Sequence, residues 1–274
     1  MSKRNDKAQF AGTESELNAM TTELDELNND VAVPSMWAGV SRMIDGMRGD
    51  IAGRSTSRRS FLMGAGAAVA GGATLIAVGS TPGLAAAATR AESRLHVADT
   101  AMFPPAGYTG DLAVAAVAAS LENLAVFAYN AGLMAATAGK LGTVPPAVAT
   151  FATTAKSQHT QHAEAWNAVL KAHGKKAITA TNPTLTPTVQ AAFAKVTDVT
   201  GLAQLALTLE STAAATYQAE TSKLKSTAAI ALSASIEPVE MQHIAILYYV
   251  MGMYPGSQTS AGSPLAFSST AAAA

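Results

Sequence analysis

Two separate stretches of the chain each carry an acidic side chain where an apolar helix would bury it. The first places Glu122 among Leu, Ala and Val with Tyr129 at position i+7, and the second repeats this pattern with Glu210 and Tyr217. Residues seven apart in a helix share one face. A carboxylate in apolar surroundings needs a partner, and a divalent cation is the simplest one. The tyrosines would then either orient such ligands by hydrogen bonds or act as redox-active neighbours.

Each of these stretches is followed by a segment with ligand-type residues three positions apart. His159 and His162 follow the first stretch, and Glu240 and His243 follow the second. Taken alone, each Glu is better explained as a solvated residue on an Ala-rich helix face, and each histidine is compatible with an ordinary core histidine. Their number and spacing favour a metal site, because four helices that direct one or two such groups inward can build a dinuclear carboxylate site.

The elements that must position these residues are helices. Gly and Pro gather at the breaks between apolar stretches rather than at hairpin spacing. An all-α domain is therefore expected, with Asp111 as the N-cap of its first helix. We expect helices over residues 111–138, 145–174, 189–196, 202–224 and 227–252. The one long connection, residues 175–200, is a crossover between the second and third long helices.

Residues 111–253 resemble the ferritin-like superfamily, particularly its exported, desiccation-related branch. That family places a terminal Glu on the first and third helices and a Glu-x-x-His pair on the second and fourth. The resemblance implies an all-α fold, a ferritin-like four-helix bundle with one long crossover, and iron or manganese as the cofactor. The ligands that it implies are Glu122 and Glu210 as terminal carboxylates, Glu240 as a bridging carboxylate, and His162 and His243 as imidazoles.

One position departs from the family pattern. Where the second helix would carry the other bridging Glu, this sequence has His159. A neutral imidazole offers one lone pair, whereas a carboxylate has two oxygens to share between metals. We keep His159 among the metal ligands and expect one well-held ion and a second that is weak or absent. Glu237, one turn before Glu240, is either an additional ligand or a solvent-facing residue at a helix irregularity.

The residues that precede the bundle carry a targeting pattern. Residues 57–62, with the pair Arg58 and Arg59, lead into a Gly- and Ala-rich run and resemble a twin-arginine export signal. Small residues at 85–88 offer a cleavage site, and cleavage is the favoured interpretation. The alternative is a membrane anchor over residues 60–83. In both cases the twin-arginine export machinery is expected to deliver the bundle to the periplasm or cell envelope.

The sequence accordingly divides into a polar leader (1–56), the signal (57–90), the bundle (91–253) and a flexible tail (254–274). Apolar stripes in the leader predict two short amphipathic helices, over residues 14–29 and 37–47. The favoured hypothesis is a solvated leader that is lost on cleavage. The alternative is a segment that binds a cytoplasmic partner or a membrane surface.

Composition excludes several kinds of chemistry. The chain has no cysteine, which removes disulfides, iron–sulfur clusters and thiolate nucleophiles. Its net charge of -1 gives no electrostatic footprint for nucleic acid. The leading hypothesis is an exported metal-binding protein that oxidises ferrous ion or disposes of peroxide. The alternatives are a non-enzymatic envelope protein with a structural or stress-protection role, and an auxiliary subunit of a membrane complex; a homo-oligomer is compatible with each.

Overall fold

The computed structural model describes residues 13–52 and 103–253, and within these ranges the chain is helical and contains no β-strand. The elements in chain order are α1 (Glu14–Leu27), a π-helical turn η1 (Asn28–Ala32), α2 (Val33–Ala52), α4 (Asp111–Thr137), α5 (Pro146–Ala172), α6 (Thr186–Phe193), α7 (Val199–Thr221) and α8 (Thr227–Val250). The all-α prediction is confirmed, and each expected helix end after residue 110 falls within three residues of the observed one.

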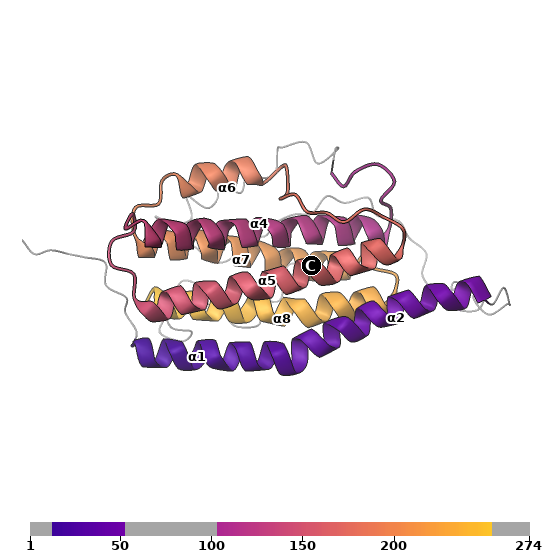
Figure 1. Cartoon of the computed structure of the whole chain (residues 1–274), viewed down its shortest axis with the longest axis horizontal. Coiled ribbons are helices and arrows are strands. Elements are labelled where there is room, and N and C mark those ends of the chain that lie inside the picture. The colour runs from indigo at the N-terminus through magenta and orange to yellow at the C-terminus, as the bar shows by residue number, and fades with distance from the viewer. Residues whose placement is uncertain (1–12, 53–102, 254–274) are drawn as a thin grey trace, which may run out of the picture.

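The four long helices α4, α5, α7 and α8 run side by side and form a bundle (Figure 1). α4 packs mainly on α5, and α7 packs mainly on α8. The turn between α4 and α5 contains Gly139 and Gly142, whose φ angles of 70° and 72° lie in the left-handed region that glycine adopts without strain. The long connection between α5 and α7 carries the short helix α6 and forms the predicted crossover.

Two helix starts differ from the expectation. Gly110, not Asp111, is the N-cap of α4. The Asp111 carboxylate instead accepts hydrogen bonds from the backbone N–H groups of Lys225 and Ser226, at 3.0 Å and 2.8 Å, and so ties the start of α4 to the turn before α8. The crossover helix begins at Thr186 because Pro187 fits the first helical turn, where its missing N–H costs nothing.

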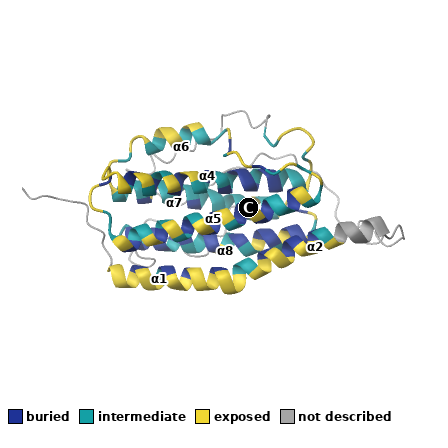
Figure 2. Cartoon of the chain, viewed as in Figure 1, coloured by how far each residue is buried: buried dark blue, intermediate teal, exposed yellow. Residues whose placement is uncertain are grey.

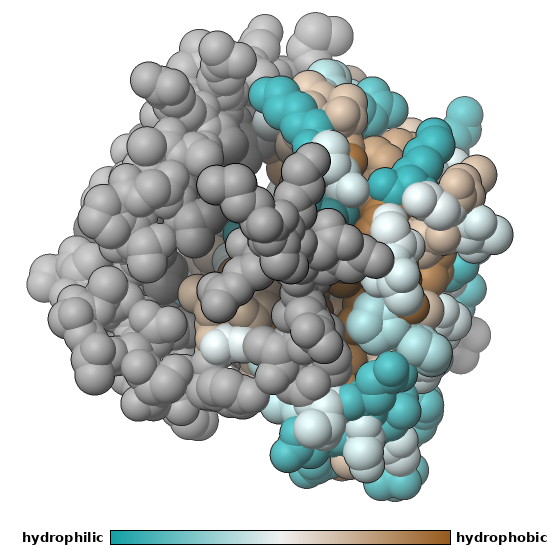
Figure 3. Space-filling view, turned by 90° about the vertical axis from the view of Figure 1, so that its left-hand side faces the viewer, coloured by the Kyte–Doolittle hydropathy of each residue, from teal (hydrophilic) through white to brown (hydrophobic). Residues whose placement is uncertain are grey.

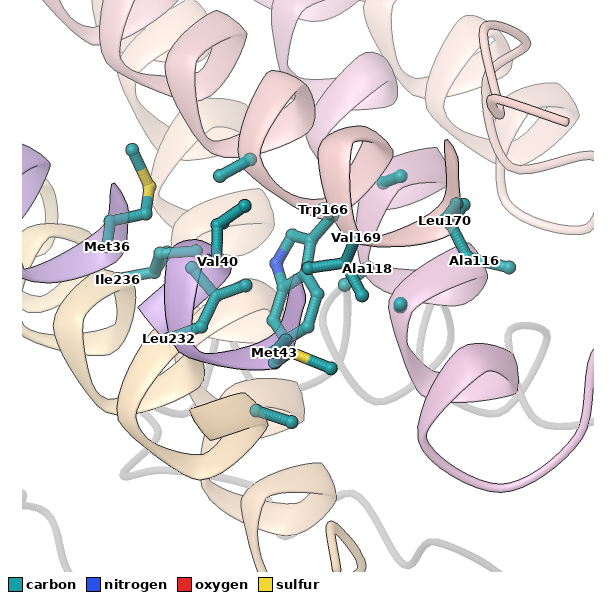
Figure 4. Packing of buried hydrophobic residues seen from close by; sticks show 14 of the residues in the cluster. Met36, Val40, Met43, Ala116, Ala118, Trp166, Val169, Leu170, Leu232 and Ile236 are labelled. Atoms are coloured by element: carbon teal, nitrogen blue, oxygen red, sulfur yellow. The ribbon is translucent and has the colours of Figure 1, made fainter. Parts of the chain in front are cut away.

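Small residues let the helices of the bundle approach one another closely. The buried face of α4 contains Ala115, Ala116 and Ala119, each fully buried. Larger side chains from the facing helices fill the space that remains, among them Trp166 of α5 and Leu232 of α8 (Figure 4). α4 is long and apolar enough to cross a membrane by length and composition, yet half of its most apolar window is buried inside the bundle.

The N-terminal helices pack along the bundle rather than lying apart from it. α1 lies against α5, and α2 lies against α8 and α5. The outer face of α1 is exposed and its inner face is buried (Figure 2). The buried apolar residues of these helices are Leu17, Leu24, Met36, Val40 and Met43. The expectation of a solvated leader is therefore wrong for residues 13–45.

An apolar cavity of about 60 Å³ lies at the end of the bundle where α4 ends and α5 begins. Tyr129 and Phe151 are at its inner limit, and Leu141 and Val250 are among its other lining residues. Figure 3 shows this end of the molecule, where hydrophobic side chains are visible between more hydrophilic ones. The predicted twin-arginine pair, the candidate anchor, the cleavage site and the C-terminal tail lie outside the described residues.

Candidate metal centre

Six ionisable side chains from the four long helices meet in the core of the bundle. They are Glu122 from α4, His159 and His162 from α5, Glu210 from α7, and Glu240 and His243 from α8. None is more than 2% exposed. The i, i+3 spacing on α5 and α8 places both members of each pair on the inward face. The structure therefore brings together all six residues that the sequence singled out.

The six residues form two overlapping groups, and within each group the candidate ligand atoms lie within 4.8 Å of one another. The Glu122 half-site consists of Glu122 and His162 together with His159 and Glu240. The Glu210 half-site consists of Glu210 and His243 together with the same His159 and Glu240. His159 and Glu240 are thus shared, which is the place a bridging residue must occupy.

The ring of His159 lies between the two terminal carboxylates. Its Nδ1 is 2.8 Å from Glu122 Oε2, and its Nε2 is 3.1 Å from Glu210 Oε1. A neutral imidazole has one N–H and one lone pair, so it can ligate in one half-site only while it donates a hydrogen bond in the other. The two half-sites are consequently unequal in either tautomer.

His162 and Glu240 are the members of the cluster without hydrogen bonds. His162 Nδ1 lies 3.1 Å from Glu240 Oε1 and 3.4 Å from Glu122 Oε2. Neither approach has hydrogen-bond geometry, and both ring nitrogens of His162 and both oxygens of Glu240 have no hydrogen-bond partner in the described structure. Buried polar atoms are normally satisfied, so converging unsatisfied lone pairs are what a metal ion would complete.

Each of the two tyrosines donates a hydrogen bond to the carboxylate on the other helix and not to the one on its own. Tyr217 of α7 donates to Glu122 of α4, and Tyr129 of α4 donates to Glu210 of α7. Trp166 Nε1 donates to the Tyr217 hydroxyl at 2.9 Å and holds that tyrosine in place. Each carboxylate is therefore oriented by a phenol from the opposite helix.

The terminal histidine of the Glu210 half-site has a partner that the sequence did not indicate. His243 Nε2 lies 2.8 Å from Gln158 Oε1, which has no hydrogen to donate, so Nε2 carries the proton. The other nitrogen, Nδ1, lies 3.2 Å from Glu210 Oε2. It donates to this carboxylate when it is protonated, and it is the nitrogen that can ligate a metal when it is not. Gln158 occurs one residue before His159, and the only available signal was its place four residues before His162, on the same helix face.

Mutual ion pairing governs the pKa values of the cluster. Burial alone would raise the pKa of Glu122, but the charges of His162 and His159 outweigh burial and lower it to about 2. Burial would lower the pKa of His162, but the neighbouring carboxylates raise it to about 9. The same balance holds the pKa of Glu210 well below its usual range and raises the pKa of His159 and His243. Without metal, the cluster is thus a buried network of imidazolium and carboxylate groups.

Glu237 belongs to neither half-site. Its side chain is half-buried and accepts a hydrogen bond from Gln218 Nε2 at 3.1 Å. Pro238 beside it is exposed and lies within an unbroken α8. The structure therefore does not bring Glu237 to the six residues of the cluster.

A cavity of about 20 Å³ adjoins the Glu122 half-site. Glu122, His159 and Tyr217 are among its lining residues, and the remaining walls are mostly apolar. This volume is sufficient for one water molecule, which needs roughly 10–15 Å³ on the same measure. Of the Glu210 half-site, only the shared His159 lines this cavity, and neither Glu210 nor His243 does.

Four long helices joined by one long crossover, with inward carboxylates and imidazoles on each, define a carboxylate–histidine helical bundle. The model of a family described as a ferritin-like domain matches residues 110–253, and the chain belongs to this family. Comparisons with curated proteins and with solved structures found no match. The predicted ferritin-like fold is confirmed, and His159 is the position at which the ligand set departs from the pattern expected of the superfamily.

Proposed function

We propose that this protein is an exported metal-binding protein whose bundle holds one or two iron or manganese ions. The observation that carries the proposal is the pair of buried groups without hydrogen-bond partners in the described structure, His162 and Glu240, in the six-residue cluster. Mixed carboxylate and imidazole ligands suit both metals, and the cluster contains no thiolate that would favour softer ions. The ligands would be Glu122, His159, His162, Glu210, Glu240 and His243.

A bound iron or manganese ion would supply one-electron redox chemistry, which supports oxidation of ferrous ion or disposal of peroxide as the activity. The chain's own residues prepare the site for this. Tyr217 and Tyr129 fix the orientation of Glu122 and Glu210. The small cavity beside Glu122 and His159 can hold one water or a molecule of similar size, while the rest of the cluster is buried.

Metal analysis of the purified protein tests the proposal directly. The full chain should be loaded without oxygen with ferrous or manganous ion, desalted, and analysed for metal per chain. We expect at least one ion per chain with one of the two metals. Loss of both metals on desalting, together with no metal in protein isolated from its own envelope, would contradict the proposal.

A second candidate function rests on the position of His159. A doubly protonated His159 donates to Glu122 and Glu210 at 2.8 Å and 3.1 Å, so it can neutralise these carboxylates without a metal. In that case the cluster is structural, and the protein is a non-enzymatic envelope component. Substituting His159 separates the two functions. If the cluster is structural, loss of the imidazolium should lower the free energy of unfolding. If the bundle is loaded with metal, the ions still neutralise the carboxylates and the free energy of unfolding should change less.

Export is the part of the proposal that depends on sequence alone. Changing both Arg58 and Arg59 to Lys should retain the full chain in the cytoplasm, because the export receptor reads that pair. Immunoblots of cytoplasmic and envelope fractions measure this. Delivery to the envelope at the level of the unchanged protein would contradict the export assignment and leave the metal proposal standing.

A further inference from the structure

The N-terminal cover, defined as residues 13–45, completes the hydrophobic core of the bundle. Met36 and Val40 of α2 lie in one buried cluster with Trp166 of α5 (Figure 4). Leu17 of α1 lies in a second cluster with Phe151. These cover residues are at most 2% exposed, so removing the cover would open the apolar face that α5 and α8 present to it.

α2 approaches α8 most closely at Gly39. A Cβ atom at this position would lie 3.2 Å from the Ala228 carbonyl oxygen and 3.3 Å from Leu232 Cβ. These distances are shorter than ordinary van der Waals contacts, so a larger residue must push the two helices apart. Gly39 therefore offers a way to loosen the cover without touching any residue of the metal cluster.

Polar contacts also fit the cover to α5. The first residues of α5 have no side-chain cap of their own, because Pro145 occupies the N-cap position. Glu14 of α1 supplies one, since its carboxylate accepts from the Ala147 N–H at 3.3 Å. Further along, Asn28 Nδ2 donates to Gln161 Oε1 at 2.9 Å. The cover is thus held by directed hydrogen bonds as well as by apolar burial.

One chain of contacts runs from the cover to the metal cluster. Gln158 is 1% exposed, accepts from His243 Nε2 at 2.8 Å, and donates from Nε2 to Asp25 Oδ1 of α1 at 3.4 Å. The contact to Asp25 favours the orientation of the Gln158 amide in which Oε1 faces His243. It thereby keeps Nε2 of His243 protonated and Nδ1 on the side of Glu210, where Nδ1 can ligate a metal.

The cover and the bundle lie on opposite sides of the expected export signal in the sequence. The cover precedes Arg58 and Arg59, and positive residues before an exported segment remain on the cytoplasmic side. The bundle follows the signal and would lie on the other side after export. The contacts between cover and bundle can therefore form only while both are in the cytoplasm.

We infer that the N-terminal cover is a detachable part of the fold that holds the metal-loaded bundle before export and separates from it during export. Asp25 and Gln158 act as positioning residues for His243, and the cover slows loss of the ion from the Glu210 half-site. This inference rests on the proposed metal binding and export. The surface that α5 and α8 present to α1 and α2 is therefore covered by the chain's own leader before export.

Metal release from the full-length chain tests the first half of the inference. The chain is retained in the cytoplasm, purified, loaded without oxygen with ferrous ion, and mixed with a chromogenic chelator. Asp25→Ala and Gly39→Leu should each release iron about 10- to 100-fold faster, as expected when a contact that orients a ligand is lost. The absorption spectrum of the cobalt(II)-loaded protein should change as well, because it reports ligand geometry.

Two matched controls separate this effect from loss of folding. Asp25→Asn keeps an acceptor for Gln158, and Ala38→Leu enlarges an exposed neighbour of Gly39. Both should release iron at the rate of the unchanged chain. If Asp25→Ala and Gly39→Leu release iron at the rate of the unchanged chain and give its cobalt spectrum, the inference is overturned while metal binding stands. Absence of any bound iron or cobalt in the unchanged chain would overturn both the inference and the proposed metal site.

Epitope tags at the two ends of the chain test the second half. After export, the N-terminal tag should be found on the cytoplasmic side and the C-terminal tag outside, as measured by protease protection in intact cells and spheroplasts. Recovery of both tags outside as one complex would show that the cover travels with the bundle, and would overturn its separation during export.

Discussion

The two half-sites of the cluster are built alike but supported differently. Each combines a terminal carboxylate with a histidine and takes a tyrosine hydroxyl from the opposite helix. In the Glu210 half-site, Gln158 holds the outer nitrogen of His243. In the Glu122 half-site, both nitrogens of His162 lack a hydrogen-bond partner in the described structure. One half-site is therefore preorganised, while the other depends on an ion to fix its histidine.

The surroundings of the half-sites differ in the same direction. The ring of Tyr129 stacks on His159 at 5.6 Å, and Phe151 contacts His243 edge-on at 6.0 Å, which closes the Glu210 half-site with aromatic groups. The Glu122 half-site adjoins the cavity of about 20 Å³. A firmly held ion and an accessible ion would therefore occupy different halves of one cluster.

The largest effect is expected from the carboxylate that both half-sites share. Glu240→Ala removes a ligand from each half-site and should abolish stoichiometric metal binding, measured by elemental analysis after desalting. Glu237→Ala is the matched control, because Glu237 lies one turn away on α8 and belongs to neither group. Equal metal loss in the two variants would contradict the assignment of Glu240 as the shared ligand.

A substitution at the other shared position should make the half-sites more equal. His159→Glu replaces one lone pair by two carboxylate oxygens and adds negative charge, so metal per chain should rise toward two ions. Isothermal titration with manganous ion would give both stoichiometry and affinities. Two ions of equal affinity in the unchanged protein would show that the histidine does not impose the inequality.

The pH dependence of stability tests the ion pairs of the metal-free cluster. The pKa of His162 rises from 6.5 to about 9 on folding, so its contribution to the free energy of unfolding is full below pH 6.5 and is lost as pH rises through 9. The pKa of Glu122 falls from 4.5 to about 2, so its contribution is full above pH 4.5 and is lost as pH falls through 2.

Metal binding should show the opposite trend over the upper part of this range. An imidazole must lose its proton before it ligates, so metal affinity should increase from pH 6.5 to 9. Melting temperatures with and without chelator, taken across this range, should therefore diverge as pH rises. His162→Gln removes one of the histidines whose pKa is raised and should reduce the slope of the metal-free curve between pH 6.5 and 9. Parallel curves for the loaded and metal-free protein would contradict proton competition.

The smallest expected difference lies between the two tyrosines. Tyr217→Phe removes the donor to Glu122 and leaves Trp166 Nε1 without its acceptor, whereas Tyr129→Phe removes only the donor to Glu210. Each loss should cost about 1–3 kcal/mol of the free energy of unfolding, with Tyr217→Phe the larger. Urea denaturation of the metal-free protein measures this. A larger cost for Tyr129→Phe would indicate that the contact between Trp166 and Tyr217 contributes little.

The sequence predicted the bundle well because its helices are long and their breaks are marked by Gly and Pro. It also indicated the six clustered residues, because an isolated charge in an apolar helix is a strong signal. It did not reveal the packing of residues 13–45, since an amphipathic stripe shows that a face is buried and not what buries it. The sequence did not predict the role of Gln158 for a similar reason, because a glutamine in a helix gives no indication of whether its side chain is buried.

The exchange of tyrosines was available in the sequence but needed geometry to be noticed. Seven residues rise about 10 Å along a helix, which is too far for Tyr129 to reach Glu122 or for Tyr217 to reach Glu210. The tyrosines had to serve another helix. The structure supplies the identity of that helix, because α4 and α7 lie close enough for each to serve the other.

This exchange relates the hairpin of α4 and α5 to the hairpin of α7 and α8 as two copies of one contact pattern. Each copy gives its hydroxyl away and receives one in return, which is the contact pattern of an isologous dimer. Neither hairpin supplies the tyrosine hydroxyl that its own buried carboxylate accepts. The two hairpins of the single chain therefore pair as reciprocally as the two subunits of such a dimer, and the crossover that carries α6 connects them.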